Sequence, residues 1–509
     1  MWLVEVGNQP LTTTLDPASK MDTIVPTIEK FRSVFTSPSF CNFRFLIVAW
    51  LKCGQAKISS MLRLVGRLAE LVPQRNGEPK HFSVFYRFFT RAQWSLDELG
   101  HVLARAFESR LPDGKVVALV DDTIFRRTGP RILGGGVHHD PLASTYSGKR
   151  GRTNQFCFGL RFVVVAIWVP VGFMRAGGVA IPVLFRLYRT PKSCSTDEHT
   201  KFTVLGARLL QIVEQWWSDR QIVVVGDRDY ACSTVLKRLD TDTEMVGRLP
   251  MDAALYDPDF EPTKGRGRPR KWGDRLPSPT ELAEDDSCPW KIERLYIYGR
   301  QVTLMVKTMQ AQWKPAGADR LLTVVLTRDP LGRLDDACFF RTRSDCSVNE
   351  VLVPASQRWS LESCFRDCKQ HLGLEGVQNG FARGTTRADT TQPGPQPEPG
   401  RSPTASRRTV PVGMYAYGIV ILWYLNHGRP LMDIMRARAF APWYNHKATI
   451  SFGDMLQAFR RQLDIENLIG TRSEGWFGEK RSSELSPGSP TGPFGPHPMG
   501  QNDPHRRYA

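Results

Sequence analysis

Apolar residues change their spacing along the chain from helical to strand-like, which divides the sequence into regions of different predicted structure. In residues 31–110, apolar side chains recur at intervals of three and four, and Ser95 with Glu98 forms a capping box before one such stretch. This pattern predicts an all-helical N-terminal region.

Short runs of β-branched and aliphatic residues follow, and they predict buried strands. The runs occupy residues 116–120, 162–169, 182–189 and 222–227, and a helical stretch at about 197–217 precedes the last of them. Continuous apolar strands combined with a helical segment indicate an α/β fold, in which helices pack on a buried, mixed sheet.

The second half of the chain has a different pattern of apolar and polar residues. Short strands separated by polar and basic segments predict a β-rich insertion at residues 234–349. A helix is predicted at about 355–371 and an apolar helix at about 412–426, with Pro, Gly and Ser concentrated in residues 384–406. The last thirty or so residues have the composition of a disordered tail.

Positive charge narrows the choice of partner. The chain has 68 Lys and Arg against 51 Asp and Glu, a net charge of +17 with an isoelectric point of about 9.6. This balance suits a nucleic acid or an anionic membrane surface, although a basic globular protein would show it too. Residues 31–110 contain twelve Lys or Arg and five Asp or Glu, which favours a dedicated binding surface.

Cysteines and apolar stretches indicate the compartment. The ten cysteines include no CxxC pair and are interpreted as reduced thiols of the cytoplasm. The apolar stretch at 162–173 is too short to span a bilayer, and the longer one at 409–428 contains a proline and glycines that indicate a buried helix. We therefore expect no membrane partner.

Three acidic residues stand where they could share metal ions. Asp121 and Asp227 each follow an apolar run, where side chains emerge from a buried strand, and Glu362 lies on a predicted helix. Arg358 and Lys369 share the helical face of Glu362. Phosphoryl transfer with two divalent ions needs several carboxylates that converge on the ions. The plainer interpretation is that the aspartates are turn residues and that the helical residues form a solvated salt-bridge ladder.

Three segments carry a resemblance to a known family. VDDTIFRRTGP contains Asp121, VVGDRDYAC contains Asp227, and RWSLESCFRDCKQHLGLEGVQ contains Glu362. Together they resemble the motifs of bacterial insertion-sequence transposases that have a D-D-E core and a Y-x2-R-x3-E-x6-K signature. Further similar segments extend the resemblance over roughly residues 30–465.

The resemblance implies a fold and a set of site residues. The family has an RNase H-like core with a β-strand insertion between the second Asp and the Glu, and the 362 − 227 = 135 residues between them here leave room for it. Asp121, Asp227 and Glu362 would be catalytic and would bind two Mg2+ or Mn2+ ions, and Arg358 and Lys369 would contact DNA phosphate. Asp122 is the neighbouring alternative, but the position of Asp121 at the strand end favours Asp121.

The resemblance also gives the predicted segments their roles. They are an N-terminal arm (1–30), a helical DNA-binding domain (31–110), the first part of the RNase H-like core (111–233), the β-rich insertion with a basic loop (234–349), the second part of the core (350–470), which the Pro-rich stretch (384–406) interrupts, and a disordered tail (471–509).

The expected function is DNA transposition in the bacterial cytoplasm, in association with the nucleoid. The protein would bind the terminal repeats of its mobile element and target DNA, self-associate, and catalyse metal-dependent strand cleavage and strand transfer. Two departures, Ala355 in place of the signature tyrosine and the Pro-rich stretch 384–406, point to an alternative: a catalytically inactive, transposase-derived DNA-binding protein. A structure-specific nuclease on the same fold is a further alternative.

A basic strip in the insertion adds candidate DNA contacts. In KGRGRPRK, Arg266, Arg268 and Arg270 alternate with Gly and Pro, which keep the segment narrow enough for the minor groove of A·T-rich DNA. A basic loop that makes only nonspecific phosphate contacts is an equal interpretation.

The charge balance predicts a steep salt dependence of DNA binding. Each neutralised phosphate releases counterions, so the log-log slope of affinity against salt should be about −0.9 per contact. Fluorescence anisotropy of a labelled duplex between 50 and 200 mM salt measures this slope. A nearly flat dependence would contradict an interface led by phosphate contacts.

Overall fold

The protein is described from a computed structural model. The structure describes residues 23–65, 80–127, 132–140, 145–147, 151–153, 155–194, 197, 199–260, 270–376 and 404–466.

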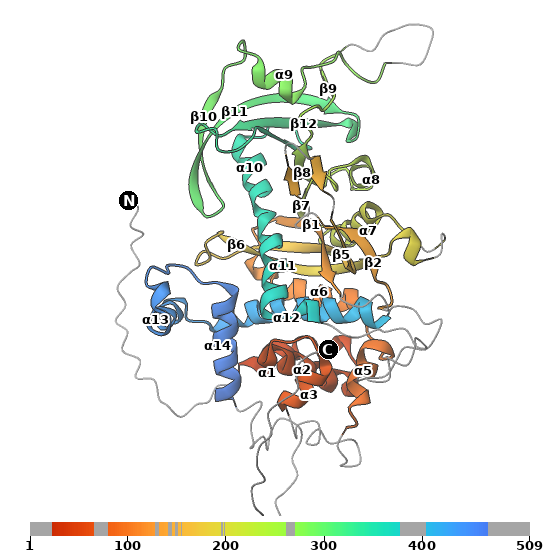
Figure 1. Cartoon of the computed structure of the whole chain (residues 1–509). Coiled ribbons are helices and arrows are strands. Elements are labelled where there is room, and N and C mark those ends of the chain that lie inside the picture. The colour runs from red at the N-terminus through yellow and green to blue at the C-terminus, as the bar shows by residue number, and fades with distance from the viewer. Residues whose placement is uncertain are drawn as a thin grey trace, which may run out of the picture.

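One long, mixed sheet forms the centre of the molecule (Figure 1). At one end, β6 (Gly178–Tyr188), β5 (Phe156–Pro170) and β1 (Lys115–Arg126) pair antiparallel, and β2 (Gly136–His139) adds to β5. On the other side of β1, β7 (Gln221–Gly226) and β8 (Glu244–Leu249) continue the sheet with parallel pairing. The expected mixed α/β sheet is confirmed.

The predicted strand runs fall within these strands, but β1 is longer than expected. β1 continues past Asp121 to Arg126, where it pairs only with β5. Its parallel pairing with β7 ends at Val120, opposite Gly226. Asp121 therefore does not follow the end of a strand, as the sequence suggested; it lies where one of the two neighbours of β1 stops.

The region predicted to be β-rich extends the same sheet rather than forming a separate one. The strands β13 (Ala337–Arg341), β12 (Gly317–Arg328), β11 (Arg300–Trp313) and β10 (Lys291–Ile297) follow β8 in antiparallel order, and the short β9 (Leu255–Tyr256) pairs with β11. A short helix, α9 (Pro279–Glu284), lies beside them. β3 (Thr145–Ser147) and β4 (Gly151–Thr153) form a hairpin apart from the sheet.

The helix expected at 355–371 begins earlier and consists of two helices. α10 (Val348–Gln357) and α11 (Trp359–His371) meet at Arg358, whose φ of −54° and ψ of −35° are helical, so the two run on in nearly one direction (Figure 1). Pro354 inside α10 has no N–H to donate to the carbonyl of Glu350. Arg341 Nη1 donates to that oxygen instead, at 2.7 Å.

A buried helix, α12 (Thr404–His427), joins the sheet to the helices of the N-terminal region (Figure 1). It begins eight residues before the expected position, and its residues from 409 to 424 are all buried. The helix α6 (Leu96–Ala106) also lies close to the sheet: at Gly100 a Cβ would lie 1.9 Å from the carbonyl oxygen of Val183, so only glycine lets α6 approach β6 this closely. No helix in the described part of the chain is long and apolar enough to cross a membrane.

Helices pack around α12 and on both faces of the sheet. α11, α12 and α6 (Leu96–Ala106) contact β6, whereas α7 (Phe202–Trp216) contacts β1, β5 and β6. The remaining helices are α1 (Ile24–Glu29), α2 (Ser37–Cys53), α3 (Ile58–Val65), α5 (Ser83–Thr90), α8 (Ser233–Leu236), α13 (Pro430–Phe440) and α14 (Phe452–Ile465). Between residues 23 and 110, every regular element that the structure describes is helical.

A buried ion pair fastens the added strands to the central ones. Arg341 on β13 is almost fully buried and pairs with Glu244 at the start of β8. Gln221 on β7 donates to the same carboxylate at 2.5 Å, and Arg343 reaches it at 3.3 Å. One cluster therefore links β7, β8 and β13.

Removing this arginine tests the role of the cluster. Arg341→Ala should lower the free energy of unfolding by about 3–5 kcal/mol, because Glu244 would remain buried without its main partner. The matched control is Arg294→Ala at an exposed position of β10, which should change it by less than about 0.5 kcal/mol. Urea denaturation followed by circular dichroism measures both, and equal effects would contradict the proposed role.

Candidate carboxylate site

Strand register brings two of the predicted carboxylates level with each other. In the parallel pair, Val120 lies opposite Gly226, and the next residues along the two strands are Asp121 and Asp227. Asp227 is held by its own turn, in which its Oδ1 accepts from the backbone N–H groups of Asp229 and Tyr230 at 3.0 and 3.2 Å. Both residues are partly buried.

The neighbouring acid, Asp122, has a different environment. Successive side chains of a strand point to opposite faces, so Asp121 faces α11 and Asp122 faces α7. Arg161 holds the carboxylate of Asp122 in a two-pronged ion pair at 2.6 and 2.8 Å, and the hydroxyl of Tyr230 donates to it at 3.3 Å. The geometry therefore favours Asp121 over Asp122 as the carboxylate available to a ligand.

Glu362 is connected to Asp121 through an arginine. Arg358, at the junction of α10 and α11, donates from Nη1 to Asp121 at 2.5 Å and from Nη2 to Glu362 at 2.6 Å. Within the described residues, no three His, Cys, Asp or Glu side chains are gathered in a way that could hold a metal ion. Arg358 thus contacts the first and the third predicted ligands, and the charge of the second, Asp227, also affects its pKa.

Burial makes this place costly for negative charge. It raises the pKa of Asp121 to about 7, against the opposing effect of Arg358, and the charges of Asp227 and Asp122 raise it further. Burial also raises the pKa of Asp227. Because one guanidinium does not offset these carboxylates, a bound cation would be favoured. Carboxylate oxygens are the ligands that Mg2+ and Mn2+ prefer, so Asp121 and Asp227 fit such an ion.

The other predicted DNA contacts are spread out. Lys369 lies on α11 with its Nζ 5.4 Å from the centre of the Phe125 ring, and burial lowers its pKa. Arg270 donates to the carbonyl of Trp272 and pairs with Asp274 at 2.6 Å. Arg266 and Arg268, like most of the Pro-rich stretch, lie outside the described residues.

Ala355, at the position of the signature tyrosine, lies on α10 and packs against the main hydrophobic core. The spacing of the sequence had placed it on one continuous helix with Glu362. The structure places the two residues on different helices, on either side of Arg358.

Several residues near the carboxylates were not among the predicted site residues. Arg161 directly precedes the apolar run 162–169, and Tyr230 lies inside the motif VVGDRDYAC. Tyr298 lies between β10 and β11, and its ring meets that of Trp359 edge-on, with centres 6.1 Å apart. The one available signal was Gly299 directly after Tyr298, because glycine is typical of a tight hairpin turn.

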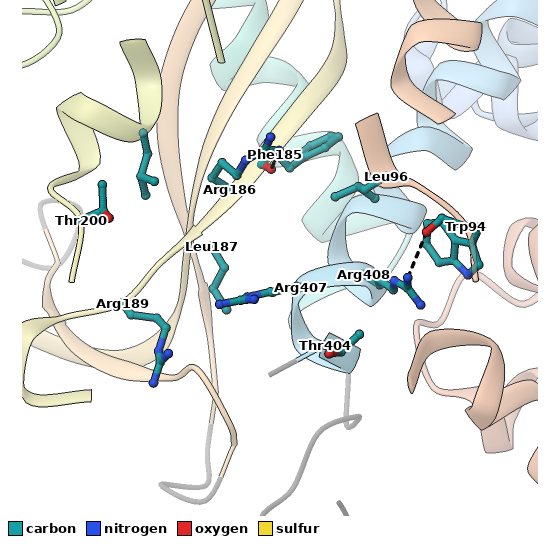
Figure 2. Close-up of a pocket in the computed structure, with 11 residues that line it drawn as sticks. Trp94, Leu96, Phe185, Arg186, Leu187, Arg189, Thr200, Thr404, Arg407 and Arg408 are labelled. Atoms are coloured by element: carbon teal, nitrogen blue, oxygen red, sulfur yellow. Dashed lines mark hydrogen bonds between the residues drawn. The ribbon is translucent and has the colours of Figure 1, made fainter. Parts of the chain in front are cut away.

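A pocket of about 450 Å3 opens beside β6 (Figure 2). Phe185 in its wall pairs with Val164, which pairs with Asp121, so the pocket lies two strands from the carboxylates. Trp94 and two threonines line it, together with four arginines: Arg186, Arg189, Arg407 and Arg408. Arg186 is paired with Asp97, and Arg408 lies 4.3 Å over the Trp94 ring while it donates to two backbone carbonyls.

The sheet and its carboxylates define an α/β protein with an acidic site where the parallel pairing of β1 and β7 ends. The family model of the DDE superfamily endonucleases matches residues 31–313, more than half of the chain, and the chain belongs to this family. The match includes Asp121 and Asp227 and ends before Glu362.

Other comparisons add little. No curated protein matches the sequence. Among solved structures, the fold is similar to that described as "Cryo-EM structure of piggyBac transposase synaptic complex with hairpin DNA (SNHP)", at 10% identity and a TM-score of 0.37, covering 89% of this chain and 84% of that chain. A likeness this weak supports no argument about function.

Replacing each of the two adjacent acids with asparagine tests which carboxylate is available to a ligand. Without divalent metal at pH 8, Asp121→Asn should leave the melting temperature unchanged or raise it, because it removes a poorly compensated buried charge. Asp122→Asn should lower stability by about 3 kcal/mol, because it breaks the pair with Arg161.

Adding Mn2+ should raise the melting temperature of the wild type and of Asp122→Asn, but not that of Asp121→Asn, because a ligand that binds only the folded state stabilises it. Thermal denaturation monitored by intrinsic fluorescence measures these shifts. A metal-induced shift in Asp121→Asn equal to that of the wild type would contradict the assignment.

Proposed function

We propose that the protein is a DNA transposase of a bacterial insertion sequence, with an RNase H-like core of the D-D-E type. It binds the ends of its mobile element, cleaves them and joins the exposed 3′-hydroxyl to target DNA. The observation that carries the proposal is the pair Asp121 and Asp227, level with each other where the parallel pairing of β1 and β7 ends, in a chain of the DDE endonuclease family.

The order of the central strands supports an RNase H-like core. Three antiparallel strands, β6, β5 and β1, are followed by two strands parallel to β1, with α11 on one face and α7 on the other. This order puts Asp121 and Asp227 side by side where the pairing of β1 and β7 ends, and α11 carries Glu362. The strands from β9 to β13 form the insertion between the second and third acids.

In the proposed reaction, Asp121 and Asp227 hold divalent cations, as enzymes of the DDE superfamily use divalent metal ions. When bound, Mg2+ or Mn2+ supplies activation of the attacking oxygen and neutralisation of the charge that develops on the leaving oxygen. Glu362 serves as the third ligand once Arg358 releases it. Arg358, whose two prongs fit phosphate as well as carboxylate, is then available to bind and orient a DNA phosphate.

Positive charge supports DNA as the substrate. Besides Arg358, we assign phosphate contacts to Lys369 and to the basic strip of Arg266, Arg268 and Arg270. The arginine-lined pocket lies along β6, two strand spacings or about 10 Å from Asp121 on β1. Self-association would bring two element ends together, and the nucleoid of the bacterial cytoplasm is the proposed location.

Ala355 favours a second candidate, a transposase-derived protein that binds element ends without cutting them. A structure-specific nuclease on the same fold would cleave DNA but would not join strands. A single set of reactions separates these possibilities: binding, cleavage and joining are scored on duplexes taken from the DNA that flanks the coding sequence, with Mg2+ or Mn2+.

Neutralising the proposed ligands tests catalysis. Asp121→Asn, Asp227→Asn and Glu362→Gln should each slow cleavage by more than about 100-fold, since even outer-shell partners of metal ligands cost 10–100-fold. Affinity for end DNA should stay within about threefold, because the basic surface is unchanged. The control is Asp319→Asn at an exposed position of β12. Substantial metal-dependent cleavage by any of the three variants would remove that residue from the site.

A further inference from the structure

A strained turn carries an aromatic residue to the edge of the carboxylate site. The hairpin of β10 and β11 closes after the pair Ile297 and Arg300, so its loop consists of Tyr298 and Gly299 alone. Both have positive φ, 53° and 71°. Such turns strongly prefer Asn-Gly or Asp-Gly, because side chains other than those of Asn and Asp rarely adopt the left-handed conformation.

The tip of this hairpin is fixed against the central sheet. A Cβ on Gly299 would lie 1.5 Å from the carbonyl oxygen of Arg175, in the connection between β5 and β6. The loop backbone therefore touches a part of the chain more than a hundred residues away. This contact fixes the position of Tyr298 even though the rest of β10 is an exposed edge strand (Figure 1).

The side chain of Tyr298 faces the first turn of α11. Its ring meets the Trp359 ring at an interplanar angle of 88°. Tyr298 is 43% exposed and Trp359 is 50% exposed, so both rings border open surface. The charges of Arg358 and Glu362 reach the phenol: burial raises the pKa of Tyr298, Arg358 lowers it and Glu362 raises it. The hydroxyl is thus a protonated donor close to the site.

Residues in sparsely populated backbone conformations concentrate at functional sites, where the strain is maintained by selection for the side chain. Asparagine at this position would relieve the turn, and the hairpin does not need a tyrosine to fold. The side chain is not buried in a core that would require it. A role outside folding accounts for a tyrosine in this turn.

We propose that Tyr298 is a substrate-contacting residue, whose hydroxyl donates a hydrogen bond to a phosphate oxygen of the DNA strand held beside Arg358 and Glu362. The inference rests on the proposed function. It also gives the site a tyrosine from the insertion, in place of the signature tyrosine that Ala355 replaces on α10. Trp359 keeps the phenol upright and limits its rotation.

Three variants test the proposal in single-turnover cleavage of the flanking-end duplex with Mn2+. Tyr298→Phe keeps the ring and its contact with Trp359 but loses the hydroxyl, and it should slow cleavage roughly tenfold to a hundredfold, the range expected for a lost hydrogen bond to a charged group. Tyr298→Asn should slow cleavage at least as much while it keeps or raises the melting temperature, because it relieves the turn. Tyr296→Phe, exposed on the same hairpin, is the control and should cleave normally.

A chemical substitution in the DNA separates contact from a structural effect. Once the wild-type cut is mapped, methylphosphonates, which lack a charged oxygen, replace the phosphates around it one at a time. At one position the substitution should slow the wild type and leave Tyr298→Phe unaffected. A structural role for the tyrosine predicts that both proteins slow equally at every position.

The outcomes of the test are distinct. Cleavage by Tyr298→Phe within twofold of the wild type, or equal sensitivity to every methylphosphonate, overturns this inference and leaves the proposed function intact. Absence of metal-dependent cleavage by the wild type on any end duplex overturns the proposed function, and this inference with it.

Discussion

The candidate site depends on the parallel register of β1 and β7. Because Val120 pairs with Gly226, the residues that follow on the two strands are level, and both are aspartates. A register shift of one residue would send one carboxylate to the opposite face of the sheet. The β-branched residues of both strands are buried on both faces, which fixes this register. The position of the acidic pair is thus a consequence of core packing.

Arg358 offsets part of the cost of that placement. Two buried carboxylates next to each other repel, and burial alone would favour their protonated forms. The guanidinium lies at the junction of α10 and α11, where it reaches Asp121 and Glu362 together. In the proposed function, metal ions would take the place of the guanidinium at the carboxylates, and Arg358 would turn toward a DNA phosphate. The same interaction would then serve both stability without ligand and ligand binding.

The strands added beyond β8 are joined to the centre at three places. The sheet continues through β13, a buried ion pair crosses the joint between Arg341 and Glu244, and the far tip of the β10–β11 hairpin rests on the backbone of Arg175. Contacts this far apart make the added strands one body with the centre. The backbone at the hairpin tip is therefore held beside the central sheet.

Apolar runs, helical spacing and short motifs predicted the strands, the main helices and the candidate acids, because these features are local. How the elements meet depends on tertiary packing. The different partners of Asp121 and Asp122 follow from the opposite faces of β1, and the break at Arg358 was hidden in an unbroken helical pattern. The approach of Tyr298 to Trp359 joins residues 61 positions apart, which no local pattern encodes. Strand register and helix packing, unlike periodicity, are set only when segments far apart in the sequence pack into one core.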